Sequence, residues 1–267
     1  MPEKPLILLT NDDGILSPGL WALAGALSRL GYVTVAAPRE QSSGAGRSLP
    51  STSDGLIREE TVDVLGQRWQ VYAVGGTPAQ AVLHAVLEIM PRQPDLLVSG
   101  INYGENICTG ISASGTVGAA LEGALLGIPS LAVSLETRKD QHLNYSVDVD
   151  FSAAAQIGAY FGGLLLERGL PAGVDLIKVD VPSDATPATP WEWTRLSHQR
   201  YYRPTRPERT SWSVPGRVDY ELALDLAIEP HDTDAYVLLK KRLVSVTPLI
   251  IDMTAPVDME QLKGFSA

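Results

Sequence analysis

Close to its N-terminus the chain reads Leu6-Ile7-Leu8-Leu9-Thr10-Asn11-Asp12-Asp13-Gly14. The apolar run at its start is too short for a typical helix and is followed by a turn residue, so it predicts a buried strand. Asp12 and Asp13 therefore emerge at the carboxyl end of a first strand. In open α/β sheets this end of the strands is where ligands bind.

Two carboxylates at neighbouring positions allow two interpretations. Their charges repel each other and are poorly hydrated in a crevice at the strand end, so a bound cation would relieve the repulsion. Hard cations such as Mg²⁺ take oxygen ligands of this kind. Alternatively, one Asp caps the next helix and the other is solvated. The pair alone leaves both interpretations open.

Composition narrows the function classes. The chain has 267 residues, of which 45% are apolar, and this is enough for a substantial core. Its net charge of −10 argues against a nucleic-acid polymer as partner but leaves room for a single nucleotide in a local pocket. The single cysteine, Cys108, excludes an intrachain disulfide. No stretch approaches the ~20 apolar residues of a membrane span, and the first apolar run is too short for a signal peptide, so we expect a cytoplasmic protein.

The chain alternates strands and helices over its first two thirds. This order predicts an α/β fold with a doubly wound, mostly parallel sheet and right-handed crossovers. The expected strands are Leu6–Thr10, Tyr32–Ala37, an antiparallel pair Leu56–Val64 and Trp69–Val74, Asp95–Ser99, Ser130–Ser134 and Val174–Val181, and the expected helices are Pro18–Leu30, Pro78–Met90, Gly115–Leu126 and Phe151–Arg168.

The composition changes after Pro182, where aromatic residues gather among many Arg and Pro. Trp191–Tyr202 and Val218–Ala227 are expected to form a long hairpin around a Pro/Arg loop, and Leu243–Leu249 a last strand. We therefore divide the chain into a catalytic core, residues 1–182, and a segment of residues 183–267 that packs on it. Because aromatic residues are enriched at interfaces, we expect the hairpin to serve oligomerisation.

Four polar loops are expected to converge at one edge of the sheet. They contribute the carboxylates of Asp12 and Asp13 and the neutral oxygens of Ser43 and Asn102. A donor set of oxygens alone fits one Mg²⁺ or Mn²⁺ ion that keeps several waters. The four histidines are scattered along the chain and do not add to this set.

The fourth loop, Ser114-Gly115-Thr116, opens a helix. Free backbone N–H groups and the positive end of the helix dipole suit a phosphate there. A divalent metal beside such an anion site is the arrangement used for phosphoryl chemistry. Each residue also has a simpler interpretation: Ser114 or Thr116 as an N-cap, Asn102 as a turn residue and Ser43 as a loop serine. The case rests on the four loops together.

These residues resemble the SurE family of survival proteins. The resemblance covers most of the chain and is weakest between about Glu136 and Pro230. It is carried by the order and spacing of Thr10-Asn11-Asp12-Asp13-Gly14-Ile15-Leu16-Ser17-Pro18-Gly19-Leu20, Gln41-Ser42-Ser43-Gly44, Gly76-Thr77-Pro78-Ala79, Val98-Ser99-Gly100-Ile101-Asn102-Tyr103-Gly104-Glu105-Asn106, Ser114-Gly115-Thr116-Val117, Thr233-Asp234-Ala235 and Val244-Ser245-Val246-Thr247-Pro248-Leu249.

The resemblance implies a Rossmann-like core with an extended C-terminal hairpin used for homodimer or homotetramer assembly. It also implies a metal-dependent nucleoside monophosphate phosphatase, a 5′-nucleotidase, with 3′-nucleotidase and exopolyphosphatase activities as further candidates. By the same resemblance, Asp12, Asp13, Ser43 and Asn102 ligate the metal, Asp12, Asp13 and Asn11 are catalytic, and Asn11, Gly44, Asn106, Ser114, Gly115 and Thr116 line the phosphate side.

Two positions depart from the family pattern. Relatives often carry Asp-Cys where this chain has Gln80-Ala81, and His or Tyr where it has Ala113. Neither change removes an expected ligand, but both bear on pocket packing and substrate preference.

Three other function classes are weighed against a phosphatase. Enzymes with an aspartyl nucleophile carry a DxD motif after the first strand. This chain lacks the second Asp of that motif, because position 14 is Gly. A nicotinamide dehydrogenase would carry the G-x-G-x-x-G spacing after the first strand, and this chain does not have it. A non-catalytic nucleotide-binding regulatory module would bind nucleotide and metal without releasing phosphate, and it is the main alternative.

Overall fold

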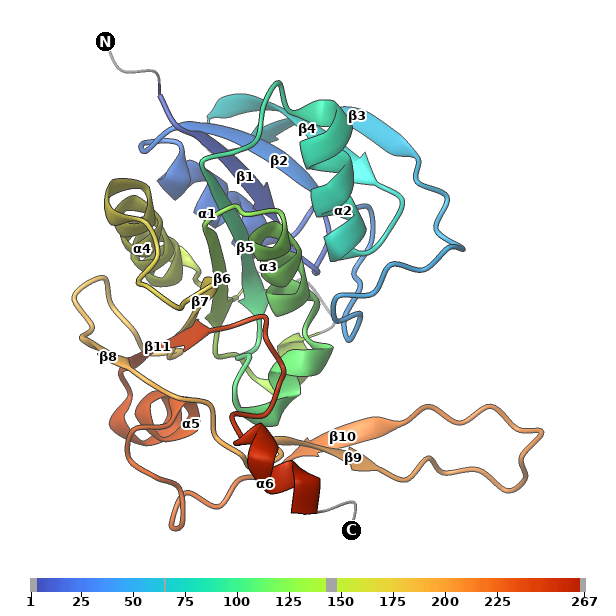
Figure 1. The fold of residues 1–267 in the computed structure, drawn as a ribbon. Coiled ribbons are helices and arrows are strands. Elements are labelled where there is room, and N and C mark those ends of the chain that lie inside the picture. The colour runs from blue at the N-terminus through green and yellow to red at the C-terminus, as the bar shows by residue number, and fades with distance from the viewer. Residues whose placement is uncertain (1–3, 65, 143–147, 265–267) are drawn as a thin grey trace.

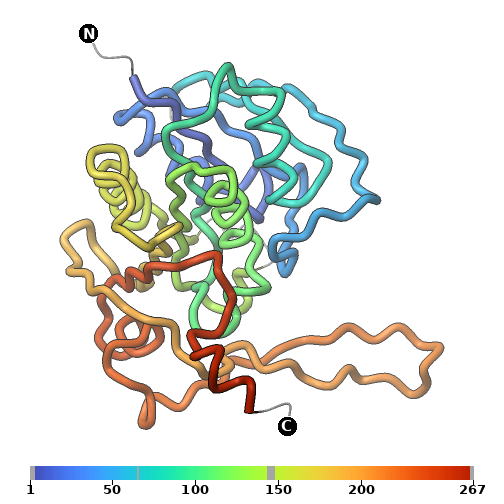
Figure 2. Tube along the Cα trace, viewed as in Figure 1, coloured from blue at the N-terminus to red at the C-terminus, as the bar shows by residue number. Residues whose placement is uncertain are grey.

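A computed structural model describes residues 4–64, 66–142 and 148–264 of the chain. Figure 1 shows a twisted sheet at the centre, helices on both of its faces, and a long hairpin that projects away from the body. The path of the chain can be followed in Figure 2, where much of the C-terminal third lies below the sheet in this view and the red segment runs close to the root of that hairpin.

The sheet has nine strands in the order β3-β4-β2-β1-β5-β6-β7-β11-β8. Its six inner strands from β4 to β7 are parallel, whereas β3 and β11 run antiparallel to their neighbours β4 and β7. The strands are β1 (Leu6–Thr10), β2 (Tyr32–Pro38), β3 (Ile57–Val64), β4 (Gln67–Val74), β5 (Leu96–Tyr103), β6 (Ser130–Leu135), β7 (Leu176–Val181), β8 (Trp191–Trp193) and β11 (Val244–Leu249).

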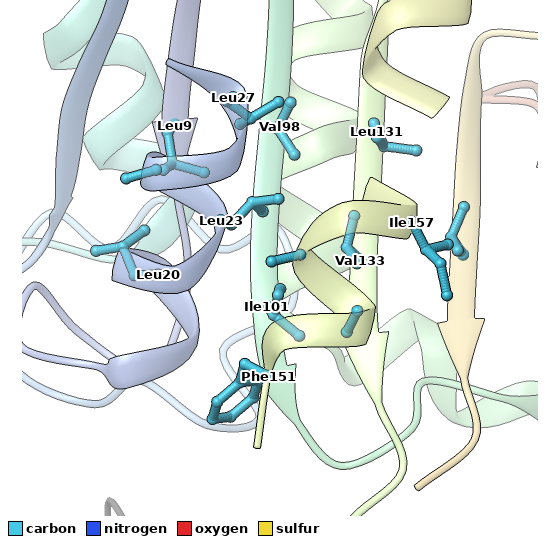
Figure 3. Close-up of a cluster of buried hydrophobic side chains, with 14 of the residues drawn as sticks. Leu9, Leu20, Leu23, Leu27, Val98, Ile101, Leu131, Val133, Phe151 and Ile157 are labelled. Carbon is cyan, nitrogen blue, oxygen red and sulfur yellow. The ribbon is translucent and has the colours of Figure 1, made fainter. Parts of the chain in front are cut away.

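The continuous apolar run of β1 follows from burial on both faces of the sheet. Side chains of a strand alternate between the faces, so Leu9 joins one core and Leu8 the other. The Leu9 side of the sheet is covered by α1 (Pro18–Leu27) and α4 (Ser152–Arg168), whose packing is shown in Figure 3. The opposite side is covered by α2 (Pro78–His84) and α3 (Gly115–Leu125). The expected doubly wound α/β fold is confirmed.

Helix ends differ from the expected ones where the chain turns early. α1 stops at Leu27 instead of Leu30, because the Leu30 N–H bonds to the Leu27 carbonyl at 2.8 Å and closes a tight turn. The helix expected over Pro78–Met90 is α-helical only to His84 and continues as a π-helical turn, Ala85–Ile89.

Gln80, one of the two departures from the family pattern, has a local structural role. Thr77 caps α2 by accepting the Gln80 N–H at 3.2 Å, and Gln80 Oε1 accepts the Thr77 N–H at 3.0 Å. This is a capping box. The Gln80 amide also donates to the Pro50 carbonyl at 3.0 Å, so it anchors the loop that follows β2.

The hairpin is shorter than expected, and one of its predicted strands was wrong. Trp191–Trp193 is β8, which pairs in parallel with β11 at the edge of the main sheet, so Trp191–Tyr202 is not a hairpin strand. The hairpin consists of β9 (Tyr202–Thr205) paired with β10 (Asp219–Leu222). Trp191 packs edge-on against Phe161 of α4, with 5.4 Å between ring centroids, and this contact places β8 at the sheet edge.

The remaining α-helices are short. They are α5 (Asp234–Tyr236), which precedes a π-helical turn, and α6 (Met259–Lys263) close to the C-terminus. Within the three described segments, no helix is both long and apolar enough to cross a membrane.

Candidate active site

The topology brings the predicted ligands together. From β1 the chain moves outward to β2, and it returns on the other side of β1 as β5, so the sheet reverses its order between β1 and β5. Ligands of open α/β sheets bind outside the carboxyl ends of the strands at such a point. Asp12 and Asp13 follow β1, and Asn102 lies near the end of β5.

Asp12 is buried against the start of α3. Thr116 Oγ1 donates a hydrogen bond to its Oδ1 at 2.5 Å. A Cβ at Gly115 would lie 2.8 Å from its Oδ2, so only glycine allows the helix to approach this closely. Burial raises the pKa of Asp12, while the hydrogen bond from Thr116 opposes the shift. The Asp12 carboxylate therefore lies in direct contact with the helix N-terminus.

Asp13 is held from two sides. Gln41 Nε2 donates to its Oδ1 at 2.9 Å, and the backbone N–H of Tyr103 donates to its Oδ2 at 3.1 Å. Burial and the charge of Asp12 raise the pKa of Asp13 well above its ordinary range. A divalent cation would reverse this balance, because a nearby positive charge favours the ionised carboxylate.

Asn11 shapes the turn that carries the two acids. Its Nδ2 donates to the Gly14 carbonyl at 3.0 Å, and its Oδ1 accepts the Gly14 N–H at 3.1 Å. Gly14 has a φ of 96°, which favours glycine. The side chain of Asn11 therefore orients the Asp pair, and its expected contact with phosphate stays a prediction.

Asn102 lies within a strand, whereas Asp95–Ser99 was expected to end before it. β5 continues to Tyr103 after a bulge between Ser99 and Asn102, and Asn102 pairs with Ser134 of β6. Asn102 Nδ2 donates to the Gly104 carbonyl at 2.6 Å. Because this bond fixes the amide, its Oδ1 is the atom left to face a ligand.

Ser43 and Gly44 lie on an exposed loop. The loop is placed by its other residues: the Ser42 N–H donates to the Asp12 carbonyl at 2.7 Å, and the Gly46 N–H donates to the Ala113 carbonyl at 3.0 Å. The loop thus runs beside both the acid pair and the start of α3. Metal ligation by Ser43 and phosphate contact by Gly44 stay predictions.

The residues at the start of α3 have different roles. Ser114 Oγ accepts the Val117 N–H at 3.1 Å, so its simpler interpretation as an N-cap is correct. Thr116 instead holds Asp12. Asn106 is buried: its Nδ2 donates to Ser134 Oγ at 2.8 Å and its N–H to Asp180 Oδ1 at 2.7 Å. Its side chain thus bonds to the end of β6.

Two groups of residues escaped the sequence analysis. Gln41 was part of a quoted motif, but no role was given to it. Lys178, Asp180 and Asp234 form a fully buried charged cluster. Its signal in the sequence was the alternation of charged and apolar residues in Ile177-Lys178-Val179-Asp180-Val181.

The donor set fits a hard cation. In the segments that the structure describes, no group of three or more His, Cys, Asp or Glu side chains is arranged to hold a metal. A site here must therefore combine the two carboxylates with neutral oxygens such as those of Asn102 and Ser43. Hard cations accept such mixed oxygen ligands together with water.

Fold and site define an α/β protein with an acidic, oxygen-rich site at the reversal point of a doubly wound sheet, beside a helix N-terminus. The family model described as "Survival protein SurE" matches residues 7–203, and the chain belongs to the SurE family.

Individual relatives match over nearly their whole lengths. A protein named 5′-nucleotidase SurE from Thermococcus gammatolerans is 48% identical over 260 residues, which cover 97% of this chain and 94% of that protein. Its namesake from Thermococcus kodakarensis is 44% identical over 259 residues, 96% of each chain. The crystal structure of the SurE protein from Aquifex aeolicus superposes with a TM-score of 0.76 at 31% identity and covers 98% of this chain and 100% of that chain.

Proposed function

We propose that this protein is a divalent-metal-dependent phosphatase that hydrolyses nucleoside monophosphates, chiefly as a 5′-nucleotidase. The observation that carries the proposal is the buried pair Asp12 and Asp13, of which Asp12 lies against the N-terminus of α3 at Gly115. The names of the relatives from Thermococcus support the substrate class.

Four residues would hold the ion: Asp12, Asp13, Ser43 and Asn102. Two carboxylates and two neutral oxygens suit Mg²⁺ or Mn²⁺, one ion per subunit. When bound, such an ion supplies Lewis-acid stabilisation of the phosphoryl oxygens and lowers the pKa of a bound water.

The protein's own residues would position the phosphate and the attacking water. The positive end of the α3 dipole orients the phosphate. Gly115 lets this helix end approach the carboxylates, and the Thr116 hydroxyl keeps Asp12 in place. One of the two carboxylates orients or deprotonates the attacking water while the other stays a ligand. Gly44 and Asn106 complete the phosphate side.

The projecting hairpin is proposed to mediate assembly into a homodimer or homotetramer. Trp212, between β9 and β10, is 93% exposed, and large exposed aromatic residues are typical of interfaces. Under this proposal, residues 1–182 form the catalytic core and residues 183–267 mediate assembly. The protein would act in the cytoplasm on small nucleotides.

A phosphate-release assay tests the proposal. Nucleoside 5′- and 3′-monophosphates and polyphosphate are offered to the purified chain with Mg²⁺, Mn²⁺ or EDTA. We expect release from 5′-monophosphates with either metal and none with EDTA, while the 3′-nucleotides and polyphosphate define the range of activity. Nucleotide binding without release from any substrate would instead identify a regulatory module.

A further inference from the structure

Gln41 bridges the acid pair and a distant segment. Its Nε2 donates to Asp13 Oδ1 at 2.9 Å and to the backbone carbonyl of His142 at 2.8 Å. One amide group thus connects the turn after β1 to His142, which lies 101 residues after Gln41 in the chain. A displacement of the His142 backbone would therefore displace the Gln41 amide that orients Asp13.

His142 also touches the second ligand-bearing segment. Its ring is buried, with Nδ1 2.8 Å from the Tyr220 hydroxyl and Nε2 3.3 Å from the Thr137 carbonyl. A Cβ at Gly104 would lie 2.8 Å from Nε2, so the ring packs directly on this backbone. The carbonyl of Gly104 is the acceptor that fixes the Asn102 amide. His142 is therefore connected to both proposed ligands, to Asp13 through Gln41 and to Asn102 through the backbone of Gly104.

The base of the projecting hairpin packs against His142. Tyr220 of β10 stacks on the His142 ring at 6.3 Å between centroids and 18° between planes, and Tyr202 of β9 meets the ring edge-on at 6.4 Å. Lys139 secures the contact, because its Nζ lies 4.5 Å from the centre of the Tyr220 ring and 3.0 Å from Asp219. The hairpin base and the His142 segment thus form one packed unit.

We propose that Gln41 and His142 are positioning residues that couple the base of the hairpin to the metal ligands Asp13 and Asn102. The inference rests on the proposed function for the identity of the ligands. Groups that hydrogen-bond to metal ligands fix their orientation, and losing one weakens metal binding. A change at Tyr220 therefore reaches the metal through His142 and Gln41, without contact between the hairpin and the ion.

Three variants of the full-length protein separate this coupling from general damage. Gln41→Ala removes the bridge itself. Tyr220→Phe removes only the hydroxyl beside His142 and keeps the ring. Tyr236→Phe is the matched control, because Tyr236 also stacks on a histidine, His231, at 4.4 Å and 25°, but has no part in the Gln41 bridge.

Three measurements are made on each variant. Calorimetric titration with Mn²⁺ gives the metal dissociation constant. Hydrogen exchange of the Tyr103 amide in EDTA reports on Asp13 without metal, because this N–H donates to Asp13 Oδ2. Phosphate release against Mn²⁺ concentration adds a third readout, since a positioning defect raises the Mn²⁺ requirement while saturating Mn²⁺ restores turnover.

We expect Gln41→Ala to weaken Mn²⁺ binding about 10- to 100-fold, the usual cost of losing an outer-shell partner. Tyr220→Phe acts one step further away, so we expect a loss of about threefold. Tyr103 exchange accelerates in both variants, and the unfolding temperature barely changes. Tyr236→Phe matches the wild type in every readout.

Wild-type Mn²⁺ affinity and Tyr103 exchange in Gln41→Ala and Tyr220→Phe would overturn the coupling. An equal change in Tyr236→Phe would do the same. If the wild type itself does not bind Mn²⁺, the proposed function fails, and Tyr103 exchange in EDTA still decides whether the hairpin base positions Asp13. Should Gln41→Ala not fold, the pair Tyr220→Phe and Tyr236→Phe decides alone.

Discussion

Two pairs of buried carboxylates in this molecule are satisfied in different ways. Asp180 and Asp234 share an internal cation: Lys178 Nζ contacts Asp180 and lies 3.3 Å from Asp234 Oδ2, and all three side chains are fully buried. Asp12 and Asp13 instead receive hydrogen bonds from neutral groups, among them the Thr116 hydroxyl and the Gln41 amide.

The difference separates a structural cluster from a candidate ligand site. The oxygens around Lys178 also accept backbone N–H groups, those of Asn106, Cys108 and Ser197, so the cluster ties the C-terminal segment to the loop after β5. Asp12 of the other pair lies against a helix N-terminus at Gly115. Neutral donors hold the pair in place, but burial raises the pKa of both carboxyl groups, and only an added cation would favour the ionised state of both.

The largest effect is expected from Asp13→Asn. The substitution keeps the shape of the side chain but removes a charge from the proposed metal site. Loss of metal-dependent stabilisation worth several kcal/mol lowers phosphate release about 1,000-fold or more. The assay is phosphate release from a nucleoside 5′-monophosphate at saturating Mn²⁺.

The same variant should keep its fold. Because burial and the charge of Asp12 raise the pKa of Asp13, replacing Asp13 by a neutral amide removes repulsion from the metal-free protein. We expect its unfolding temperature in EDTA to stay close to that of the wild type, because the relief of repulsion offsets the one hydrogen bond, from Gln41 or from Tyr103, that an amide NH2 group does not accept. Near-normal turnover in Asp13→Asn would contradict the proposed function. A large loss of stability would contradict the distinction between a ligand site at Asp12 and Asp13 and a structural cluster around Lys178.

Lys178→Met tests the other cluster and should act on stability first. It leaves Asp180 and Asp234 buried without their cation, and breaking a buried ion pair in this way costs about 3–5 kcal/mol. The free energy of unfolding, measured by urea denaturation, should fall by that amount.

Lys241→Met provides the matched control. Lys241 also pairs with a carboxylate, Glu192 at 2.6 Å, but at the partly exposed surface. Surface pairs contribute only about 0–1 kcal/mol. Equal stability losses in Lys178→Met and Lys241→Met would show that the buried cluster is not the structural element inferred here.

Much of the fold and of the site could be predicted from local pattern. The apolar run of β1 indicated burial on both faces, and the alternation of strands and helices fixed the doubly wound order. Because parallel strands end at one edge, the loops holding Asp12, Asn102 and Ser114 could be brought together without knowledge of any contact. The start of α2 at Pro78 was likewise predicted.

What escaped prediction depends on partners far away in the sequence. Trp191-Glu192-Trp193 alternates as any exposed strand does, and its place in the main sheet depends on pairing with β11, about fifty residues later, and on contact with Phe161 of α4. The role of His142 depends on Tyr220 and on Gln41, which lie 78 and 101 residues away. Spacing within a segment carries no information about such contacts.

A third carboxylate at the same edge gives the smallest expected effect. Glu105 is buried, and its Oε2 has no hydrogen-bond partner within the described segments. Burial raises its pKa from 4.5 to about 7. Glu105 therefore keeps its proton up to about pH 7 in the folded protein but loses it above pH 4.5 on unfolding. The folded state binds more protons in this window, so stability from this group falls as the pH rises.

Glu105→Gln should remove this pH dependence, because glutamine keeps the shape of a protonated carboxyl group and does not titrate. Between pH 4.5 and 7, the wild type should lose at most roughly 3 kcal/mol more stability than the variant, as measured by urea denaturation in EDTA. Parallel stability curves for the two proteins would show that Glu105 is ionised when folded. Glu105 would then belong with Asp180 and Asp234, as a charge balanced within the protein.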